Sequence, residues 1–309
     1  MPLLRMMRRE DDKMKRTAMN PTDTPWIAPE EMEPQTRTGV APTAAVGLAP
    51  SLAVALDPIA PTPARDTALR GRLMARVARS AAANQAFVTT RRQDGNWQTL
   101  QAGIQQRLLH ADEAAQTYVL QWADEAELDL PSQGLTHECL VLTGELTVGE
   151  GADASTLRAH DYLIHASGPL RLRAKAGTSL YWRRIRSDVD AYGQAVASHL
   201  AQADQLAWEP LRQGVEIKPL YAEGERVSMF VRFEPGATVP AHSHGHGEEC
   251  LMVEGDLFLG DVLLCEGDFQ FAPRDTGHHE GLHSDVGCLL YFHGAIDPVV
   301  IDPAVRPAA

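Results

Sequence analysis

The sequence predicts a mainly β protein in which one β domain occurs twice. From Asn96 onward, short apolar runs alternate with turn residues every 8–12 residues, a spacing typical of β-sandwiches and barrels. Residues 97–103 are similar to residues 208–214, and residues 137–146 to residues 248–257, both at an offset of 111. Residues 177–181 and 287–291 repeat at 110. An almost constant offset over three anchors indicates a duplicated unit.

The N-terminal fifth of the chain differs from this region. Residues 1–64 hold 10 of the 20 prolines and little periodic apolar pattern, so we expect a disordered tail. Residues 65–84 predict a linker helix, with Asp66 as N-cap and apolar residues at helical spacing. One face of this helix is basic, and it is either a solvated face or a surface for a partner. Its arginines are Arg70, Arg72, Arg76 and Arg79.

The remainder divides into two domains and a connector. We assign residues 85–186 to the first β domain and residues 207–309 to the second. Between them, residues 187–206 predict a helical connector, because Tyr192, Val196 and Leu200 recur every fourth residue.

Charge and hydropathy exclude two classes of partner. The chain carries 28 Lys and Arg against 41 Asp and Glu, and residues 207–309 contribute 17 acidic residues against 6 basic ones. Such a negative field repels phosphate, so direct nucleic-acid binding is not expected. The chain has no apolar run of 18 residues, so we expect no membrane span and a cytoplasmic protein.

The positions of the cysteines and histidines indicate which type of functional site to expect and where it lies. The four cysteines form no CxxC pair, which disfavours a thiolate zinc site and favours reduced, buried thiols. Seven of the 12 histidines lie between residues 242 and 293. This enrichment locates a candidate site in the second β domain.

Four residues there have the spacing of metal ligands. His242 and His244 are two residues apart, so on a strand their side chains share one face. Glu248 follows a Gly-His-Gly turn, and His278 arrives from a later hairpin. Three imidazoles and a carboxylate suit a divalent ion, zinc or iron in the first place and manganese, nickel or copper as alternatives.

Several residues next to these four are of types that could also bind a metal. His246 and Glu249 could substitute, but the alternation of a strand favours His244 and Glu248. His279 would point away from His278 in an extended segment. His283 and His293 fit no pattern and are interpreted as structural or surface histidines. Cys250 has a counterpart at the same place in the first copy, Cys139, which favours packing.

The spacing of these residues resembles the signature of the cupins. Residues 236–255 match G(X)5HXH(X)3E(X)6G, and residues 267–278 match G(X)5PXG(X)2H with Asp275 in place of the second glycine. The resemblance implies two tandem cupin domains, which are jelly rolls or small β-barrels that bind a metal inside. In the first copy His137 stands where Glu248 does, Arg171 stands where His278 does, and HXH is absent. We therefore expect the first domain to bind no metal and to serve packing or dimerisation.

The sequence of the second domain is similar to that of one group of cupins. Residues 208–220 and 232–237, together with the HXH motif, resemble the ChrR-type domains of zinc-containing anti-sigma factors that respond to oxidative stress. The resemblance covers residues 66–300 and implies a sigma factor or another regulatory protein as partner. Residues 1–64 contain no His or Cys, so the N-terminal zinc unit of that family is not expected there.

Two functions follow as hypotheses. The first is a ChrR-like regulator or stress sensor with a small-molecule ligand in the second barrel, and as in many cupins a homodimer. The second is a metal-dependent dioxygenase of the type that cleaves diketones or flavonols, or an isomerase, with Glu248 as ligand or base. A storage or structural double cupin is a third.

Overall fold

The computed structural model describes residues 63–130, 134–166, 168–186 and 196–302. The predicted tail, apart from residues 63 and 64, lies outside the described residues. The chain divides into two compact units, of which residues 86–309 form the larger part of one and residues 32–85 the other. The second unit contains α3, Pro63–Ala83, which begins three residues before the expected cap at Asp66. None of its residues is buried, and its apolar residues Leu69, Leu73, Met74 and Val77 are exposed.

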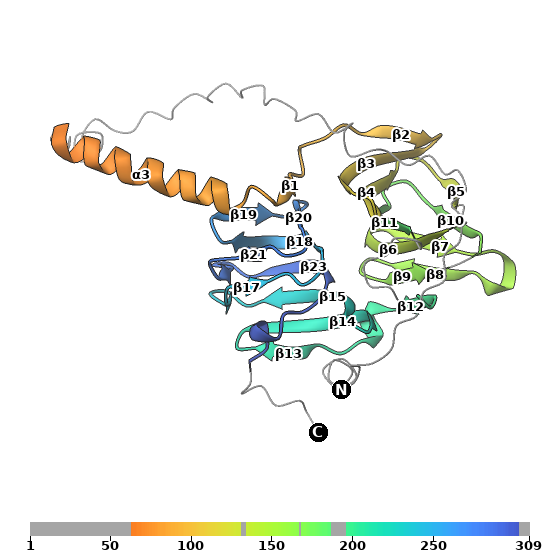
Figure 1. Cartoon of the computed structure of the whole chain (residues 1–309). Helices are drawn as coiled ribbons and strands as arrows, with labels where there is room; N and C mark the ends of the chain where they lie inside the picture. The colour runs from red at the N-terminus through yellow and green to blue at the C-terminus, as the bar shows by residue number, and fades with distance from the viewer. Residues whose placement is uncertain (1–62, 131–133, 167, 187–195, 303–309) are drawn as a thin grey trace, which may run out of the picture. The chain divides into compact units, whose positions relative to one another are not determined.

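Antiparallel strands make up most of the larger unit (Figure 1). The first copy of the repeat contains β1 (Val88–Thr90), β2 (Gln98–Gln101), β3 (Ile104–Ala111), β4 (Ala115–Trp122), β5 (Ala126–Leu130), β6 (Leu135–Thr143), β7 (Glu145–Val148), β8 (Ser155–Arg158), β9 (Tyr162–His165), β10 (Leu170–Ala174) and β11 (Ser179–Arg186). The second copy contains β12 (His199–Ala201), β13 (Glu209–Arg212), β14 (Val215–Glu223), β15 (Arg226–Phe233), β16 (Thr238–Val239), β17 (His242–Ser243), β18 (Glu248–Leu259), β19 (Val262–Cys265), β20 (Phe269–Ala272), β21 (Gly277–His278), β22 (Leu282–His283) and β23 (Cys288–Gly294).

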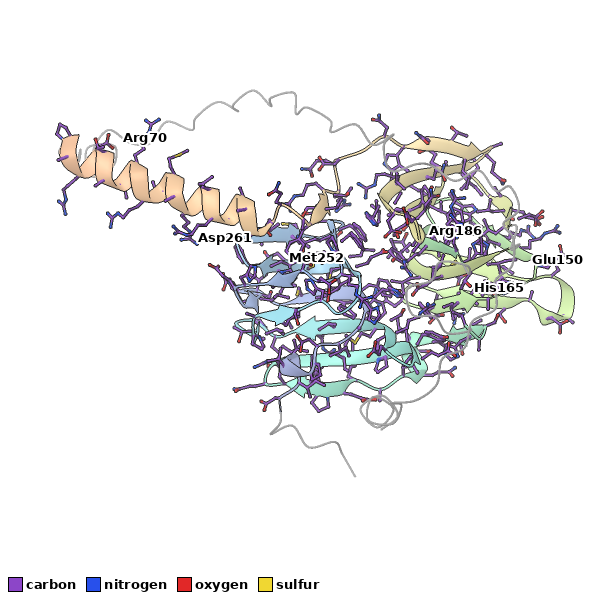
Figure 2. All side chains as sticks on the ribbon, viewed as in Figure 1. Arg70, Glu150, His165, Arg186, Met252 and Asp261 are labelled. Carbon is purple, nitrogen blue, oxygen red and sulfur yellow. The ribbon has the colours of Figure 1, made fainter. Side chains whose placement is uncertain are left out.

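These strands build two barrels. The first barrel, β2 to β11, has a large sheet in the order β9-β6-β11-β4-β3-β2 and a small sheet in the order β5-β10-β7-β8. The second barrel, β13 to β23, has the matching large sheet β20-β18-β23-β15-β14-β13. Each barrel encloses its own apolar core. Figure 2 shows Met252 among the strands of the second barrel, where it is buried. The mainly β fold with two tandem domains, predicted from the 111-residue repeat, is confirmed.

A third apolar cluster joins the two barrels. It contains Leu109, Leu140 and Tyr181 of the first barrel together with their repeat equivalents Leu220, Leu251 and Tyr291 of the second. Because strand residues alternate between faces, these side chains lie on the outer faces of the large sheets. The two copies therefore pack through equivalent surfaces, as the subunits of a two-fold dimer do.

The copies also exchange their first strands. β1 belongs to the first copy but pairs with β20 of the second barrel, with Val88 opposite Phe271. β12 opens the second copy but pairs with β9 of the first barrel, with His199 opposite Ile164. These two strands are 111 residues apart, so the exchange follows the repeat.

This exchange corrects one prediction. Of the expected helical connector 187–206, residues 187–195 lie outside the described residues. Residues 196–206 form strand β12 and the 3-10 turn Ala203–Gln205 rather than an α-helix. The four-residue spacing of Val196 and Leu200 suggested a helix, but the free edge of β9 supplies backbone hydrogen bonds to an extended segment. Pairing with the sheet overrides the local apolar spacing.

Candidate metal centre

The structure brings the four predicted ligands together inside the second barrel. One ligand atom from each of His242, His244, His278 and Glu248 lies within 4.8 Å of the others. His242 comes from β17, His278 from β21 and Glu248 from the start of β18. Among the described residues, this is the one group of His, Cys, Asp or Glu close enough to hold a metal ion.

A short ladder places two of these histidines side by side. β17 pairs with β21, and His242 stands directly opposite His278. Ser243 stands opposite Gly277, where a Cβ atom would lie 2.7 Å from the backbone oxygen of His242. Only glycine therefore allows the two strands to approach so closely. The turn before β21 contains Asp275 at φ 64°, in the signature's second glycine position, and aspartate tolerates this left-handed conformation better than most residues.

Gly277→Ala tests this close approach. The added methyl group must push β21 away from β17, and we expect a loss of about 1–3 kcal/mol in the free energy of unfolding. Metal affinity should fall with it, because His278 moves relative to His242. Urea unfolding and metal titration measure the two effects. A Gly281→Ala variant, whose Cβ would meet the Val239 carbonyl at 2.8 Å outside the cluster, is the matched control. It should lose stability with a smaller effect on metal affinity.

Hydrogen bonds to the ring nitrogens set the tautomers of two ligands. His242 Nδ1 lies 3.0 Å from the Pro240 carbonyl oxygen, which can only accept. His244 Nδ1 lies 2.9 Å from the Thr276 hydroxyl oxygen, and that hydroxyl already donates to the Pro273 carbonyl. Both Nδ1 atoms must therefore carry the proton. The Nε2 atoms keep their lone pairs, as metal-binding imidazoles require.

The electrostatics of the cluster favour a cation. Burial, aided by the neighbouring imidazoles, lowers the pKa of His244 to about 4 and that of His278 to about 3. Burial also lowers the pKa of His242. All three rings are neutral at pH 7, which is the form that binds metals. Burial raises the pKa of the Glu248 carboxyl to about 8, although a hydrogen bond from Cys250 opposes this.

One buried ring nitrogen of the cluster lacks a partner, and the carboxyl group beside it has only a weak one. His244 Nε2 is buried without a hydrogen-bond partner among the described residues. The Glu248 carboxylate accepts a bond of 3.6 Å from the Cys250 thiol and lies 3.7 Å from His244 Nε2. A buried carboxylate without a cation and a buried lone pair without a donor are both costly. One divalent ion among the four side chains would satisfy both, so the donor set fits a metal.

The cluster borders an apolar pocket of the second barrel. His242, Glu248, Cys250 and Asp297 form its polar side. The rest of the lining is mainly aliphatic and aromatic, including Leu211, Met229, Phe233, Val239, Leu290 and Phe292. A small ligand that reached the metal from this side would contact apolar surface.

Phe87, just before the exchanged strand β1, covers another side of the cluster. Its ring centroid lies 5.2 Å from that of His278 and 5.9 Å from that of His244. The sequence does not predict this contact, because the repeat gives no sign that the first strand of one copy belongs to the other barrel. It also does not predict the contacts of Thr276 and Pro240, although both lie within two residues of a predicted ligand.

The neighbouring histidines and Glu249 lie outside the cluster. His246 pairs through Nε2 with Glu225 Oε2 at 2.7 Å, and His279 is exposed. His283 stacks on Phe258, with ring centroids 4.7 Å apart. Glu249 is buried on the opposite face of β18 from Glu248, and His293 is buried among polar groups between the barrels.

The equivalent positions of the first barrel have other surroundings. His137 is buried and accepts a hydrogen bond from the Trp182 indole at 3.2 Å. Arg171 lies on β10 and makes ion pairs with Asp129, at 2.6 Å, and with Glu150. Its side chain is 42% exposed, so this arginine does not point into a buried site.

Comparisons with known proteins agree with this fold. A family model described as the ChrR cupin-like domain matches residues 196–297. A solved Pseudomonas aeruginosa protein named for induction by glyoxylate has a TM-score of 0.57 and 14% identity, over 68% of this chain and 88% of its own. A Nostoc punctiforme protein provisionally assigned as a dioxygenase has a TM-score of 0.53 and 15% identity, over 72% and 87%. Oxalate decarboxylase of Lactobacillus farciminis, solved with formate, has a TM-score of 0.51 and 12% identity, over 67% and 86%.

The fold and the comparisons define the class. The chain has the fold of two tandem cupin-like barrels, and a His and Glu cluster in the second barrel has the composition of a metal site. Its second barrel matches the model of the ChrR cupin-like domain over residues 196–297. At such low identities the solved structures show the fold alone. No helix among the residues that the structure describes is long and apolar enough to cross a membrane.

Proposed function

We propose that the second barrel binds one divalent metal ion through His242, His244, His278 and Glu248. The observation that carries the proposal is a four-residue donor set in which three imidazoles are neutral and one buried carboxylate faces them. The bound metal would neutralise that carboxylate and supply a Lewis acid at the edge of the apolar pocket.

We further propose that the protein is a cytoplasmic ChrR-like regulator whose metal-loaded barrel senses a small molecule. The family match over residues 196–297 supports the regulatory role. The pocket beside His242 and Glu248 supports a small, largely apolar ligand. A sigma factor or another regulatory protein is the proposed partner, and the arginine face of α3 is the candidate surface for it.

A metal-dependent dioxygenase acting on diketones or flavonols is the second candidate. The apolar lining beside the cluster favours it, because such a pocket excludes water around a bound substrate. In that case Glu248 would bind the metal and would also be the base beside it that takes up the substrate's proton.

Metal analysis separates these functions. We expect elemental analysis of protein purified without added metal to give one metal per chain, with zinc for the regulator and iron, copper or nickel for the oxygenase. Oxygen uptake with a panel of β-diketones is the second measurement. Uptake by the purified protein that chelation abolishes would overturn the purely regulatory account. Zinc content, no uptake and co-purification with a sigma factor would overturn the oxygenase.

A further inference from the structure

A buried polar cluster joins the barrels on the side of the sheets away from the metal ligands. At its centre are two glutamates, Glu138 on β6 and Glu249 on β18, which are 0% and 1% exposed. They are 111 residues apart and so occupy the same place in the repeat. Each points out of its own barrel and toward the other.

First-barrel residues hold Glu249. The Tyr181 hydroxyl donates to its Oε2 at 2.7 Å, and the Thr117 hydroxyl donates to the same oxygen at 2.8 Å. Arg183 Nε donates to Oε1 at 2.8 Å. Such hydrogen bonds to a carboxylate are strong, and together they fix its position and offset the cost of burying it.

Glu138 is held in the reciprocal way by the second barrel. Its Oε1 accepts hydrogen bonds from Tyr291 at 2.7 Å and Ser228 at 2.5 Å, and it lies 3.2 Å from His293 Nδ1. Tyr291, Ser228 and His293 are the repeat equivalents of Tyr181, Thr117 and Arg183, at offsets of 110 or 111. The two barrels thus exchange glutamates as well as strands.

The exchange is reciprocal, although Glu138 also accepts hydrogen bonds from two residues of its own barrel, Tyr162 at 2.8 Å and Arg183 at 3.4 Å. The residues that precede the two glutamates differ as well. The residue before Glu249 is the ligand Glu248, whereas the residue before Glu138 is His137, which bonds Trp182. Neighbouring strand residues point to opposite faces, so anchoring the Glu249 side chain fixes the backbone that carries Glu248. The first barrel therefore holds the segment of β18 from which the metal ligand projects.

From these contacts we infer that the first barrel is a positioning element for the metal centre. Through Tyr181, Thr117 and Arg183 it clamps Glu249, and thereby it sets the position of Glu248 and the metal affinity of the second barrel. This inference rests on the proposed metal site. Groups that orient metal ligands contribute roughly 10- to 100-fold to affinity when they contact the ligand. Because this clamp acts through one peptide unit, we expect about the lower figure.

Matched tyrosine variants of the full chain test the inference. Tyr181→Phe removes the hydroxyl on Glu249, and Tyr291→Phe removes the equivalent hydroxyl on Glu138. Both variants should lower the stability of the metal-free protein to a similar extent. Only Tyr181→Phe should weaken Co²⁺ and Zn²⁺ binding, by about tenfold in chelator competition. Only that variant should change the visible absorption spectrum of the Co²⁺-loaded protein.

Other results would overturn the inference. Equal affinities for the two variants, or affinities that fall only in proportion to stability, would mean that the clamp is purely structural. If Tyr181→Phe does not fold, the milder pair Thr117→Val and Ser228→Ala gives the same comparison. A wild-type chain that binds neither ion would overturn the proposed metal site itself. Wild-type binding with indistinguishable variants would overturn the positioning role alone.

Discussion

His244→Ala is expected to abolish metal binding and the stability that depends on it. His244 is 2% exposed, its Nδ1 is committed to Thr276, and its Nε2 faces Glu248 without another partner. Alanine removes that donor and leaves two imidazoles and a carboxylate. A ligand that binds only the folded state stabilises it by about 4 kcal/mol at a concentration 1,000 times its Kd. Zinc should raise the free energy of unfolding of the wild type by about this amount and that of the variant hardly at all.

Metal stoichiometry and thermal unfolding with and without zinc measure this effect. His279→Ala is the matched control, because His279 follows the ligand His278 but is exposed and lies outside the cluster. The control should keep one metal per chain, and zinc should stabilise it as much as it stabilises the wild type. If His244→Ala retained one metal per chain, the assignment of the site would be wrong.

Glu248→Gln should make the metal-free protein more stable at alkaline pH while weakening its metal binding. Burial raises the pKa of Glu248 from 4.5 to about 8, because a charged carboxylate among apolar side chains loses its hydration. At pH well above 8 the metal-free wild type must hold that charge, at a cost of about 5 kcal/mol. Glutamine has nearly the same shape, carries no charge and avoids this cost.

The pH dependence has a definite sign. Between pH 4.5 and 8 the folded metal-free chain binds more protons at Glu248 than the unfolded chain does, so this group's contribution to stability falls as pH rises. His244 acts in the opposite direction: its pKa is lowered to about 4, so its contribution rises with pH up to about 6.5. Above pH 6.5 the histidines of the cluster no longer change their protonation, so the remaining pH dependence comes from Glu248.

Urea unfolding of the metal-free proteins from pH 6 to pH 9 measures this difference. Wild type should lose stability over that range, and Glu248→Gln should lose much less. Zinc should reverse the order, because the wild-type carboxylate then binds the ion and glutamine is a weak ligand. Parallel pH profiles of the two metal-free proteins would show that Glu248 is hydrated rather than buried.

The repeat and the motif spacing were sufficient to predict the duplicated β fold and the residues of the cluster. The spacing worked because ligands two apart on a strand share a face and because the turn positions demand Gly277 and a residue such as Asp275. Glu248 and Glu249 were separated correctly by the same alternation: one lies in the cluster and the other lies between the barrels.

What the sequence did not predict depends on contacts between the copies. The segment that contains β12 has apolar residues at helical spacing, but pairing with the edge of β9 makes it a strand. Phe87 reaches the cluster only because β1 crosses to the other barrel. Glu138 and Glu249 recur at the repeat offset with outward parity. The exchange of these glutamates could not be predicted, because the repeat alone does not say that the copies face each other.

X-ray absorption spectroscopy of the zinc-loaded chain is the most direct test of the metal centre. We predict nitrogen and oxygen ligands at about 2.0–2.2 Å from the zinc, with the outer scattering of three imidazoles. The same spectrum from His244→Ala should lack that signature. A sulfur shell near 2.3 Å, which would make the Cys250 thiolate a ligand, or fewer than three imidazoles would contradict the site built from His242, His244, His278 and Glu248.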